Sequence, residues 1–246
     1  MDEQRDVVVV GAGLAGLAAA ATAAAGGSSV LLVDPHPAAN RAGTDQVGRF
    51  RLNRGAHALY RRGAGRAVLR RLGVPVQGKL PPLTGALGRR GDVVDRLPLG
   101  PVSMARSQLV PPRGLARLGK VLAGMPRWRP ARLADRTAAA WFDDLGLAGE
   151  AREGVEMLAR TATYVADLDR VSADLAAGQM RSATAGGVLY LHGGWSSLVD
   201  GLAGAGEGHG VERLVAAARS VEPDGGRVRV TIGRDGDERV ILAAAV

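Results

Sequence analysis

Three glycines and one carboxylate near the N-terminus have the types and the spacing needed to hold a diphosphate and its sugar. Gly11, Gly13 and Gly16 form the pattern Gly-x-Gly-x-x-Gly directly after four valines at residues 7–10. The first glycine permits a tight turn, the second lets a pyrophosphate approach the backbone, and the third lets a helix pack against a strand. Asp34 follows after roughly 20 residues, where a carboxylate can accept a hydrogen bond from a ribose hydroxyl. The pattern predicts a dinucleotide-binding turn.

A strand, a turn and a helix must position these residues. The valines suit a central parallel strand that is buried on both faces. A helix expected over residues 14–25 would direct its N-terminal amides and the positive end of its dipole at the phosphates. A second strand, at residues 29–33, leads into Asp34. We therefore expect the cofactor to contact the whole turn, which consists of Gly11, Ala12, Gly13, Leu14, Ala15 and Gly16.

The composition excludes several kinds of chemistry. The chain of 246 residues contains no cysteine, which rules out disulfides, thiolate metal ligands and a cysteine nucleophile. Its four histidines, at positions 36, 57, 192 and 209, are scattered and lack the spacing of metal ligands. We therefore predict no metal site, and redox chemistry would require a bound organic cofactor.

Positive charge is concentrated in the middle of the chain. The formal net charge is +8, and residues 41–136 hold 21 basic and 4 acidic side chains. This basic segment suits an anionic substrate or a peripheral contact with a membrane surface. An arginine-rich proteome explains it as well, and the presence of only two lysines favours that explanation. Aromatic residues are too few for base stacking, so we expect no nucleic-acid partner.

The N-terminal region has the pattern of neither a membrane span nor an export signal. Residues 7–25 are uncharged, but their glycines and the strand-turn-helix pattern argue against a transmembrane helix. Asp2 and Glu3 stand where a secretory signal would carry positive charge. We therefore predict a soluble, cytoplasmic protein.

The middle third has mostly helical patterns. We expect a short amphipathic helix at residues 65–72 and a hairpin at 85–98 whose turn lies near 90–92. Prolines interrupt residues 98–130, and a helical pattern covers 131–162. This third is expected to form an inserted domain.

The last third returns to short strands. We expect a strand at residues 187–191, a glycine turn at 193–194 and a helix at 195–202, which the glycine-rich stretch 204–210 would end. Three further strands, at 211–221, 227–232 and 239–244, would form a meander.

In this order, the segments resemble those of the flavin-dependent superfamily that contains phytoene desaturases, protoporphyrinogen oxidases and flavin amine oxidases. The resemblance extends over nearly the whole chain and is carried by residues 7–34, 50–60, 190–199 and the meander. It implies an α/β fold with a Rossmann-like FAD-binding domain, built from a parallel sheet plus a three-stranded β-meander. Residues 1–60 and 186–246 would form that domain, and 61–185 an inserted, mostly helical substrate domain.

The same resemblance assigns the cofactor contacts. The glycine turn would hold the FAD pyrophosphate, and Asp34 the adenosine ribose. Gly55, Ala56 and His57 would lie against the isoalloxazine, and the backbone at Ala218 against the adenine. Gly193 and Gly194 would form the turn that returns the chain to the flavin.

The chain departs from the family in two places. Where the family has Gly-Gly-Arg after the ribose carboxylate, Arg41 is in place, but Ala39 and Asn40 replace the glycines. A Cβ at these positions would require a different backbone path. The sequence also stops at Val246, where members of the family continue into a strand-helix unit that closes over the flavin.

The function implied by the resemblance is that of an FAD-dependent oxidoreductase, which removes a hydride from an apolar or amine-type small molecule. The residues identify no catalytic acid or base and no oligomeric state. Two alternatives stay open. One is an NAD-dependent dehydrogenase, because an aspartate at position 34 also suits NAD. The other is a degenerate or truncated flavoprotein that binds a dinucleotide without turnover.

Overall fold

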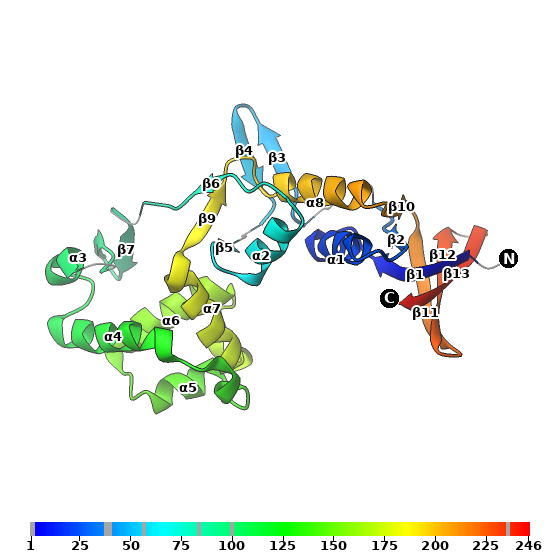
Figure 1. The fold of residues 1–246 in the computed structure, drawn as a ribbon. Coiled ribbons are helices and arrows are strands. Elements are labelled where there is room, and N and C mark those ends of the chain that lie inside the picture. The colour runs from blue at the N-terminus through cyan, green and yellow to red at the C-terminus, as the bar shows by residue number, and fades with distance from the viewer. Residues whose placement is uncertain (1–2, 37–40, 56–57, 83–84, 99–100, 235–236) are drawn as a thin grey trace. The chain divides into compact units, whose positions relative to one another are not determined.

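The computed structural model describes residues 3–36, 41–55, 58–82, 85–98, 101–234 and 237–246, and it divides into two compact units. The first unit consists of Met1–Leu59, Gly63–Lys79 and Tyr190–Val246, and the second of Tyr60–Arg62 and Leu80–Leu189. The chain therefore enters the second unit from the first and returns to it (Figure 1).

Three parts of the chain fall in a different unit from the one expected. Tyr60 and residues 186–189 belong to the second unit, although the sequence placed them in the first. Residues 63–79, which include helix α2 (Ala64–Arg71), belong to the first unit, although the sequence placed 61–185 in the inserted domain. Val74 accounts for this last difference, because it packs against helix α8 (Ser196–Gly208) at Gly201. A Cβ at Gly201 would come within 2.6 Å of the Val74 side chain, so Val74 can pack against α8 only because residue 201 is glycine.

A six-stranded sheet forms the framework of the first unit, in the order β10-β2-β1-β13-β12-β11. The parallel strands are β10 (Glu212–Leu214), β2 (Val30–Val33), β1 (Glu3–Val10) and β13 (Asp237–Ala245). The antiparallel continuation consists of β12 (Arg227–Arg234) and β11 (Ala217–Asp224). Because β13 pairs with both β1 and β12, the expected parallel sheet and meander are parts of one sheet.

The valine run is central in this sheet, as predicted, but its burial is uneven. Val8 lies opposite Leu31 of β2 and is fully buried, whereas Val10 is 48% exposed. The strand that is buried along its whole length is β2. Val10 is more accessible because it is the last residue of β1 before the glycine turn.

The single strand expected at residues 211–221 is two strands. β10 runs parallel to β2, with Leu214 opposite Val33, and β11 pairs antiparallel with β12 from Ala217 onward. These two strands occupy opposite edges of the sheet order. One hydrophobic core cluster consists of Val8, Leu31, Val33, Ala216, Val230, Ile232, Ile241 and Ala243.

Helix α1 (Leu14–Ala25) has the predicted bounds and contacts β1, β2 and α8. Helix α8 continues to Gly208, so the glycine-rich stretch does not end it where the sequence predicted. A Cβ at Gly206 would lie 3.3 Å from Val211 and 3.9 Å from Ala21 of α1. The small residues therefore allow the two helices to pack closely.

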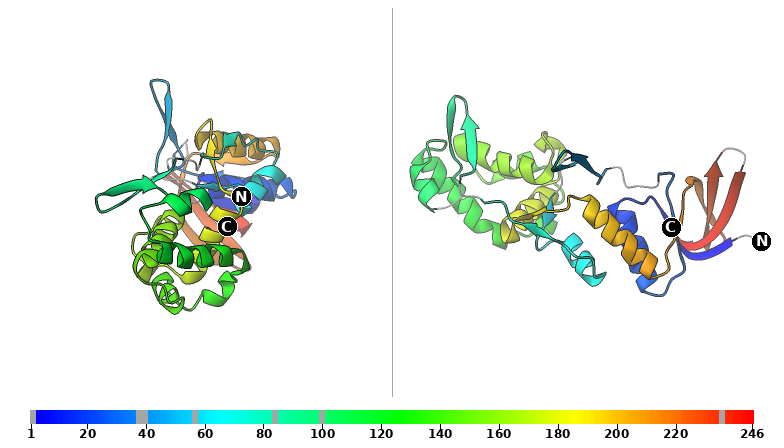
Figure 2. Two further views of the ribbon diagram at one scale, coloured as in Figure 1. Left: turned by 90° about the vertical axis from the view of Figure 1, so that its left-hand side faces the viewer. Right: turned by 90° about the horizontal axis from the view of Figure 1, so that it is seen from above.

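Short strands complete the first unit. β3 (Thr44–Val47) and β4 (Phe50–Asn53) form an antiparallel ribbon (Figure 2). Val47 and Phe50, near the tip of the ribbon, are 55% and 59% exposed. β9 (Val188–Leu191) pairs antiparallel with β6 (Gly78–Lys79), and β5 (Leu59–Tyr60) completes this three-stranded sheet.

The second unit is mostly helical, as predicted. Its helices are α3 (Pro101–Arg106), α4 (Pro112–Gly124), α5 (Ala138–Asp144), α6 (Gly149–Thr163) and α7 (Ala173–Gly186), with the hairpin β7 (Leu87–Arg90) and β8 (Val93–Arg96). Three short 3-10 turns are η1 (Met125–Arg127), η2 (Pro130–Leu133) and η3 (Leu168–Arg170). Phe142, Val155 and Met180 lie in its core.

Helix α4 forms within the stretch that the prolines were expected to interrupt. Pro112 is its first residue, a position at which the missing amide hydrogen is tolerated and the fixed φ angle favours the helix. The proline therefore begins this helix rather than preventing it.

The described residues contain neither a candidate membrane helix nor a candidate metal cluster. No helix in those ranges is both long and apolar enough to cross a membrane. In the same ranges, no cluster of three or more His, Cys, Asp or Glu side chains could hold a metal ion.

Candidate nucleotide-binding site

The three glycines of the turn differ in what surrounds them. Gly11 has a φ of +103°, which favours glycine, and its amide donates to Val33 O at 2.8 Å. A Cβ at Gly16 would overlap the carbonyl oxygen of Gly11. A Cβ at Gly13 would meet no atom within 4 Å, and its φ of −73° suits any residue. Gly11 and Gly16 are therefore required by the fold itself, whereas Gly13 leaves open space.

That space lies at the N-terminus of α1, because Gly13 is the residue immediately before the helix and its carbonyl accepts from the Leu17 amide at 2.9 Å. The first amides of a helix lack partners within the helix, and the helix dipole is positive at this end. Together these features make a site for an anion such as a diphosphate.

Asp34 follows the end of β2 and is bonded to the glycine turn. Its Oδ2 accepts from the Ala12 amide at 2.6 Å, and its Oδ1 accepts from the His36 amide at 2.7 Å. A carboxylate has about four lone-pair positions, so both oxygens can accept further hydrogen bonds. The side chain is 21% exposed, which leaves it accessible to a ligand. Asp34 therefore holds the turn in place and can still accept from a sugar hydroxyl.

Asp34 opens onto a cavity of about 340 Å³. The lining residues are Ala12, Leu32, Asp34, His36, Glu207, Arg213, Leu214 and Val215. They come from the ends of β1, β2 and β10 and from the C-terminal part of α8. The carboxyl ends of parallel strands are where open α/β sheets bind nucleotides. The cavity therefore has the position expected for the nucleoside part of a dinucleotide.

The structure brings together only some of the predicted residues. Ala12 and Asp34 share the cavity, and Leu14 and Ala15 begin α1. Ala218 lies in β11 opposite Ile232 and is not among the lining residues. Arg41 is exposed, ahead of β3. Gly55 has a φ of +98°, and its neighbours Ala56 and His57 lie outside the described residues.

Leu214 and Val215 line the cavity in place of Ala218, and the sequence analysis missed them. Val215 is 55% exposed although it is apolar and next to a buried strand. The pairing of β10 with β2 brings this segment beside Asp34, whose amide donates to Leu214 O at 3.2 Å. Because that pairing joins residues far apart in the sequence, the local pattern contained no signal for it.

A second cluster of polar contacts joins the glycine turn at 193–194 to the β3–β4 ribbon. The Thr44 amide donates to Ser196 Oγ at 2.8 Å, and the Ser196 amide donates to Thr44 Oγ1 at 3.1 Å. Asn53 Oδ1 accepts from the Trp195 amide at 3.0 Å. Gly194 has a φ of +70°, and a Cβ there would overlap the Thr44 side chain. The turn and the ribbon are therefore fitted closely to each other.

This cluster connects two of the segments that carry the sequence resemblance, residues 50–60 and 190–199. The sequence analysis singled out Gly193 and Gly194 but not Thr44, Asn53 or Ser196. Each of these three side chains accepts from a backbone amide of the facing segment, and Thr44 Oγ1 also donates to Asn53 Oδ1 within the ribbon. Polar residues beside a glycine turn are common, so their types alone did not distinguish them.

Comparisons with known proteins agree with this geometry. Residues 9–72 match the NAD(P)-binding Rossmann-like domain family, and a search of curated proteins gave no match. Putrescine oxidase bound to putrescine is 20% identical, with a TM-score of 0.70, and the match covers 99% of this chain and 57% of that one. Cyclohexylamine oxidase from Brevibacterium oxydans is 21% identical, with a TM-score of 0.66. That match covers 96% of this chain and 56% of the oxidase chain.

The chain has the fold of these oxidases. RAB GDI from Plasmodium falciparum also shares this fold, with 12% identity and a TM-score of 0.62. The match covers 99% of this chain and 65% of the RAB GDI chain. The chain therefore spans less than two thirds of the length of each of these structures. The predicted α/β Rossmann-like architecture is confirmed, and so is the resemblance at the level of the fold. Because differently named proteins share this fold, it does not by itself determine the activity.

Proposed function

We propose that the chain forms the FAD-binding part of an oxidoreductase that removes a hydride from an apolar or amine-type small molecule. The observation that carries the proposal is the open space at Gly13, at the N-terminus of α1 and next to a cavity edged by Asp34. The glycine leaves room for a ligand at a site suited to anions, and the carboxylate suits the adjoining sugar. The fold shared with two amine oxidases supports the choice of reaction class.

Each part of the site has a role in binding. The first amides of α1 would donate to the pyrophosphate, and Asp34 would accept from the adenosine ribose while still bonded to Ala12 and His36. Leu32, Leu214 and Val215 provide apolar walls for the base. A bound flavin would supply the hydride acceptor. The catalytic groups of this chain stay unassigned.

Two alternatives also have support. The family matched by residues 9–72 is described as NAD(P)-binding, and Asp34 suits the ribose of NAD as well as that of FAD. The second alternative is a degenerate or truncated flavoprotein that binds a dinucleotide without turnover, because a shared fold does not by itself determine the activity. The three functions differ in which dinucleotide binds and in whether it is reduced.

A glycine-to-alanine pair tests the site. Gly13→Ala adds one methyl group to space that is empty in the free chain, so the variant should fold normally. The methyl group would block the approach of the pyrophosphate, so FAD affinity should fall at least tenfold, or about 1.4 kcal/mol. Gly204→Ala is the matched control, because its added Cβ on α8 also meets no atom within 4 Å.

Calorimetric titration with FAD and with NADH separates the outcomes. FAD binding that is weakened by Gly13→Ala and not by Gly204→Ala would support the proposed site. Equal FAD affinity for both variants would contradict it. Tight NADH binding without FAD binding would favour the NAD-dependent dehydrogenase. Stoichiometric FAD that no amine or other hydride donor reduces under anaerobic conditions would favour the protein without turnover.

A further inference from the structure

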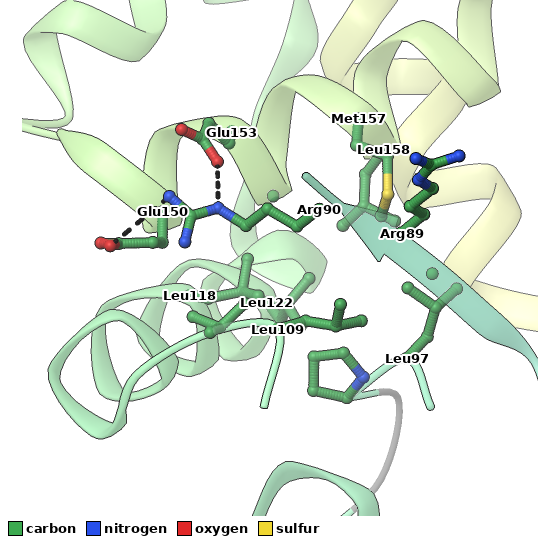
Figure 3. A pocket seen from close by; sticks show the side chains of 14 residues that line it. Arg89, Arg90, Leu97, Leu109, Leu118, Leu122, Glu150, Glu153, Met157 and Leu158 are labelled. Atoms are coloured by element: carbon green, nitrogen blue, oxygen red, sulfur yellow. Dashed lines mark hydrogen bonds and ion pairs between the residues drawn. The ribbon is translucent and has the colours of Figure 1, made fainter. Parts of the chain in front are cut away.

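The second unit contains a cavity of its own, of about 220 Å³, between the β7–β8 hairpin, α4 and α6 (Figure 3). Its apolar lining consists of Leu97, Pro98, Leu109, Val110, Leu118, Leu122, Met157 and Leu158. All of the lining residues belong to the second unit, whereas the cavity beside Asp34 belongs to the first. The two cavities are therefore separate sites.

The charged side chains at this cavity bond to protein groups rather than facing an empty centre. Arg90 Nε donates to Glu153 at 2.8 Å, and Arg90 Nη2 lies 3.6 Å from Glu150 (Figure 3). Arg89 Nε donates to Gly91 O at 2.8 Å, and its side chain is 73% exposed. Because these charges are paired, a bound ligand would meet mainly hydrocarbon. The chemistry of the lining therefore selects an apolar ligand.

Two glycines shape the walls of the cavity. A Cβ at Gly88 of β7 would lie 2.5 Å from Leu97 Cδ2 and 2.9 Å from Leu109 Cδ1, so its absence lets both leucines reach across the strand. A Cβ at Gly154 of α6 would lie 3.4 Å from Leu118 Cδ2. At Gly154, no side chain of α6 covers the helix backbone that faces Leu118. A larger side chain at position 154 would therefore extend into the cavity.

Polar contacts tie the walls of the cavity to one another. The pair of Arg90 with Glu153 ties β7 to α6. Asp95 of β8 accepts from the Gln108 amide at 2.6 Å, which ties the hairpin to the segment before α4 and lowers the pKa of Asp95. The Leu97 amide donates to Ala86 O at 2.8 Å and extends the hairpin ladder. These contacts fix the hairpin against α6 and against the segment before α4.

We propose that this cavity binds a small neutral hydrocarbon group, the size of one six-membered ring with one or two further carbons. An apolar protein cavity of about 150 Å³ stays dry and accepts benzene. The present cavity, at about 220 Å³, has room for such a ring, and its lining is mainly apolar with paired charges at its edge. The proposal does not depend on the dinucleotide site, because the lining lies wholly within the second unit.

Toluene is the probe for this site. The full chain, labelled with ¹³C at leucine and methionine methyl groups, would be titrated with toluene and followed by NMR. We expect saturable shifts at the methyl groups that line the cavity, such as those of Leu109, Leu122 and Met157. Leu202, buried in α8 of the first unit, should not shift. Shifts spread evenly over both units would overturn the proposal.

A filled cavity and a matched control make the test specific. Gly154→Leu places a side chain among the lining residues, so toluene affinity should fall at least tenfold. Gly178→Leu adds the same group to α7, where a Cβ meets no atom within 4 Å, and should leave affinity unchanged. Circular dichroism would check the fold of both variants. Unchanged toluene affinity in folded Gly154→Leu would overturn the proposal.

A second pair of variants covers the case in which Gly154→Leu does not fold. Gly154→Ala adds only a methyl group, in van der Waals range of Leu118, and should weaken toluene binding modestly. Leu122→Ala enlarges the cavity and should shift the preference from toluene toward naphthalene by at least fivefold. The same toluene-to-naphthalene ratio in the original chain and in both variants would count against the site.

Discussion

The two cavities of this protein are built from different parts of the polypeptide. In the first unit, the space at the end of the sheet is bordered by backbone amides, by Gly13 and by the Asp34 carboxylate. In the second unit, leucine and methionine side chains surround space between a hairpin and two helices. The first therefore offers backbone and carboxylate hydrogen-bonding groups to a ligand, and the second offers mainly hydrocarbon.

The difference has a consequence for substitutions. In the first unit the critical positions are those at which any added atom collides with backbone, as at Gly16. In the second unit the critical positions are those at which large side chains fill the core, as at Phe142. We therefore expect added atoms to disrupt the first unit most and removed atoms to disrupt the second.

Phe142→Ala should have the largest effect on stability. Phe142 is fully buried, and its ring centroid lies 5.1 Å from that of Trp141. Truncation would leave a cavity and should lower the free energy of unfolding by about 4 kcal/mol. Urea unfolding would measure the change. Val102→Ala, at a position of α3 that is 68% exposed, should change it by less than about 0.5 kcal/mol. A similar loss in both variants would contradict the comparison.

Gly16→Ala should have the next largest effect. The added methyl group overlaps the carbonyl oxygen of Gly11, so β1 and α1 must separate or the turn must shift. Forced overpacking of this kind should lower the free energy of unfolding by about 3 kcal/mol. Gly13→Ala, three residues earlier, makes the same chemical change in open space and should cost far less. Equal denaturation midpoints for the two variants would show that the close approach at Gly16 is not required.

Gly194→Ala should lower the free energy of unfolding by less, about 2 kcal/mol, because two smaller penalties combine. The positive φ of 70° disfavours alanine, and the methyl group also meets the Thr44 side chain. Gly210→Ala isolates the first penalty, since Gly210 has a φ of +83° and no atom within 4 Å of an added Cβ. In thermal unfolding, the melting temperature should fall further for Gly194→Ala than for Gly210→Ala. The reverse order would mean that the ribbon and the turn adapt freely.

Asp6→Asn should have the smallest effect on stability, and this effect should diminish in acid. Asp6 accepts from the Ser29 amide and from the Ser29 hydroxyl, both at 2.7 Å, and these bonds lower its pKa from 3.8. The stability that Asp6 contributes is therefore present above pH 3.8 and is lost as the pH falls below that value toward the folded-state pKa.

The Asp6→Asn variant should accordingly lose stability less steeply below pH 3.8 than the original chain does. Urea unfolding over a series of acidic pH values would measure the two slopes. Asp200→Asn changes the net charge equally at a different place and serves as the control. Identical slopes for Asp6→Asn and the original chain would mean that the bonds to Ser29 do not persist in solution.

The nucleotide turn could be predicted because its requirements are local. The glycine spacing, the bounds of α1 and the place of Asp34 all follow from contacts within about 30 residues of sequence. The β7–β8 hairpin was predictable for the same reason, since Gly91 lies in its turn with a φ of +58°. The glycine-rich end of α8 misled the sequence analysis because its glycines serve contacts with α1 and Val211 rather than a helix end.

The sequence by itself determined a strand, a glycine turn and a helix followed by a second strand that ends at Asp34, because these depend on residue types at fixed short spacings. It also determined a protein without cysteine chemistry. Only the tertiary structure placed Leu214 and Val215 in the lining of the cavity beside Asp34. It also placed the side chains of Thr44 and Asn53 within hydrogen-bond distance of the backbone that follows Gly194. It also decided that leucines from a hairpin and two helices enclose a second cavity. Such contacts join residues that are far apart along the chain, and they form only when the strands and helices pack.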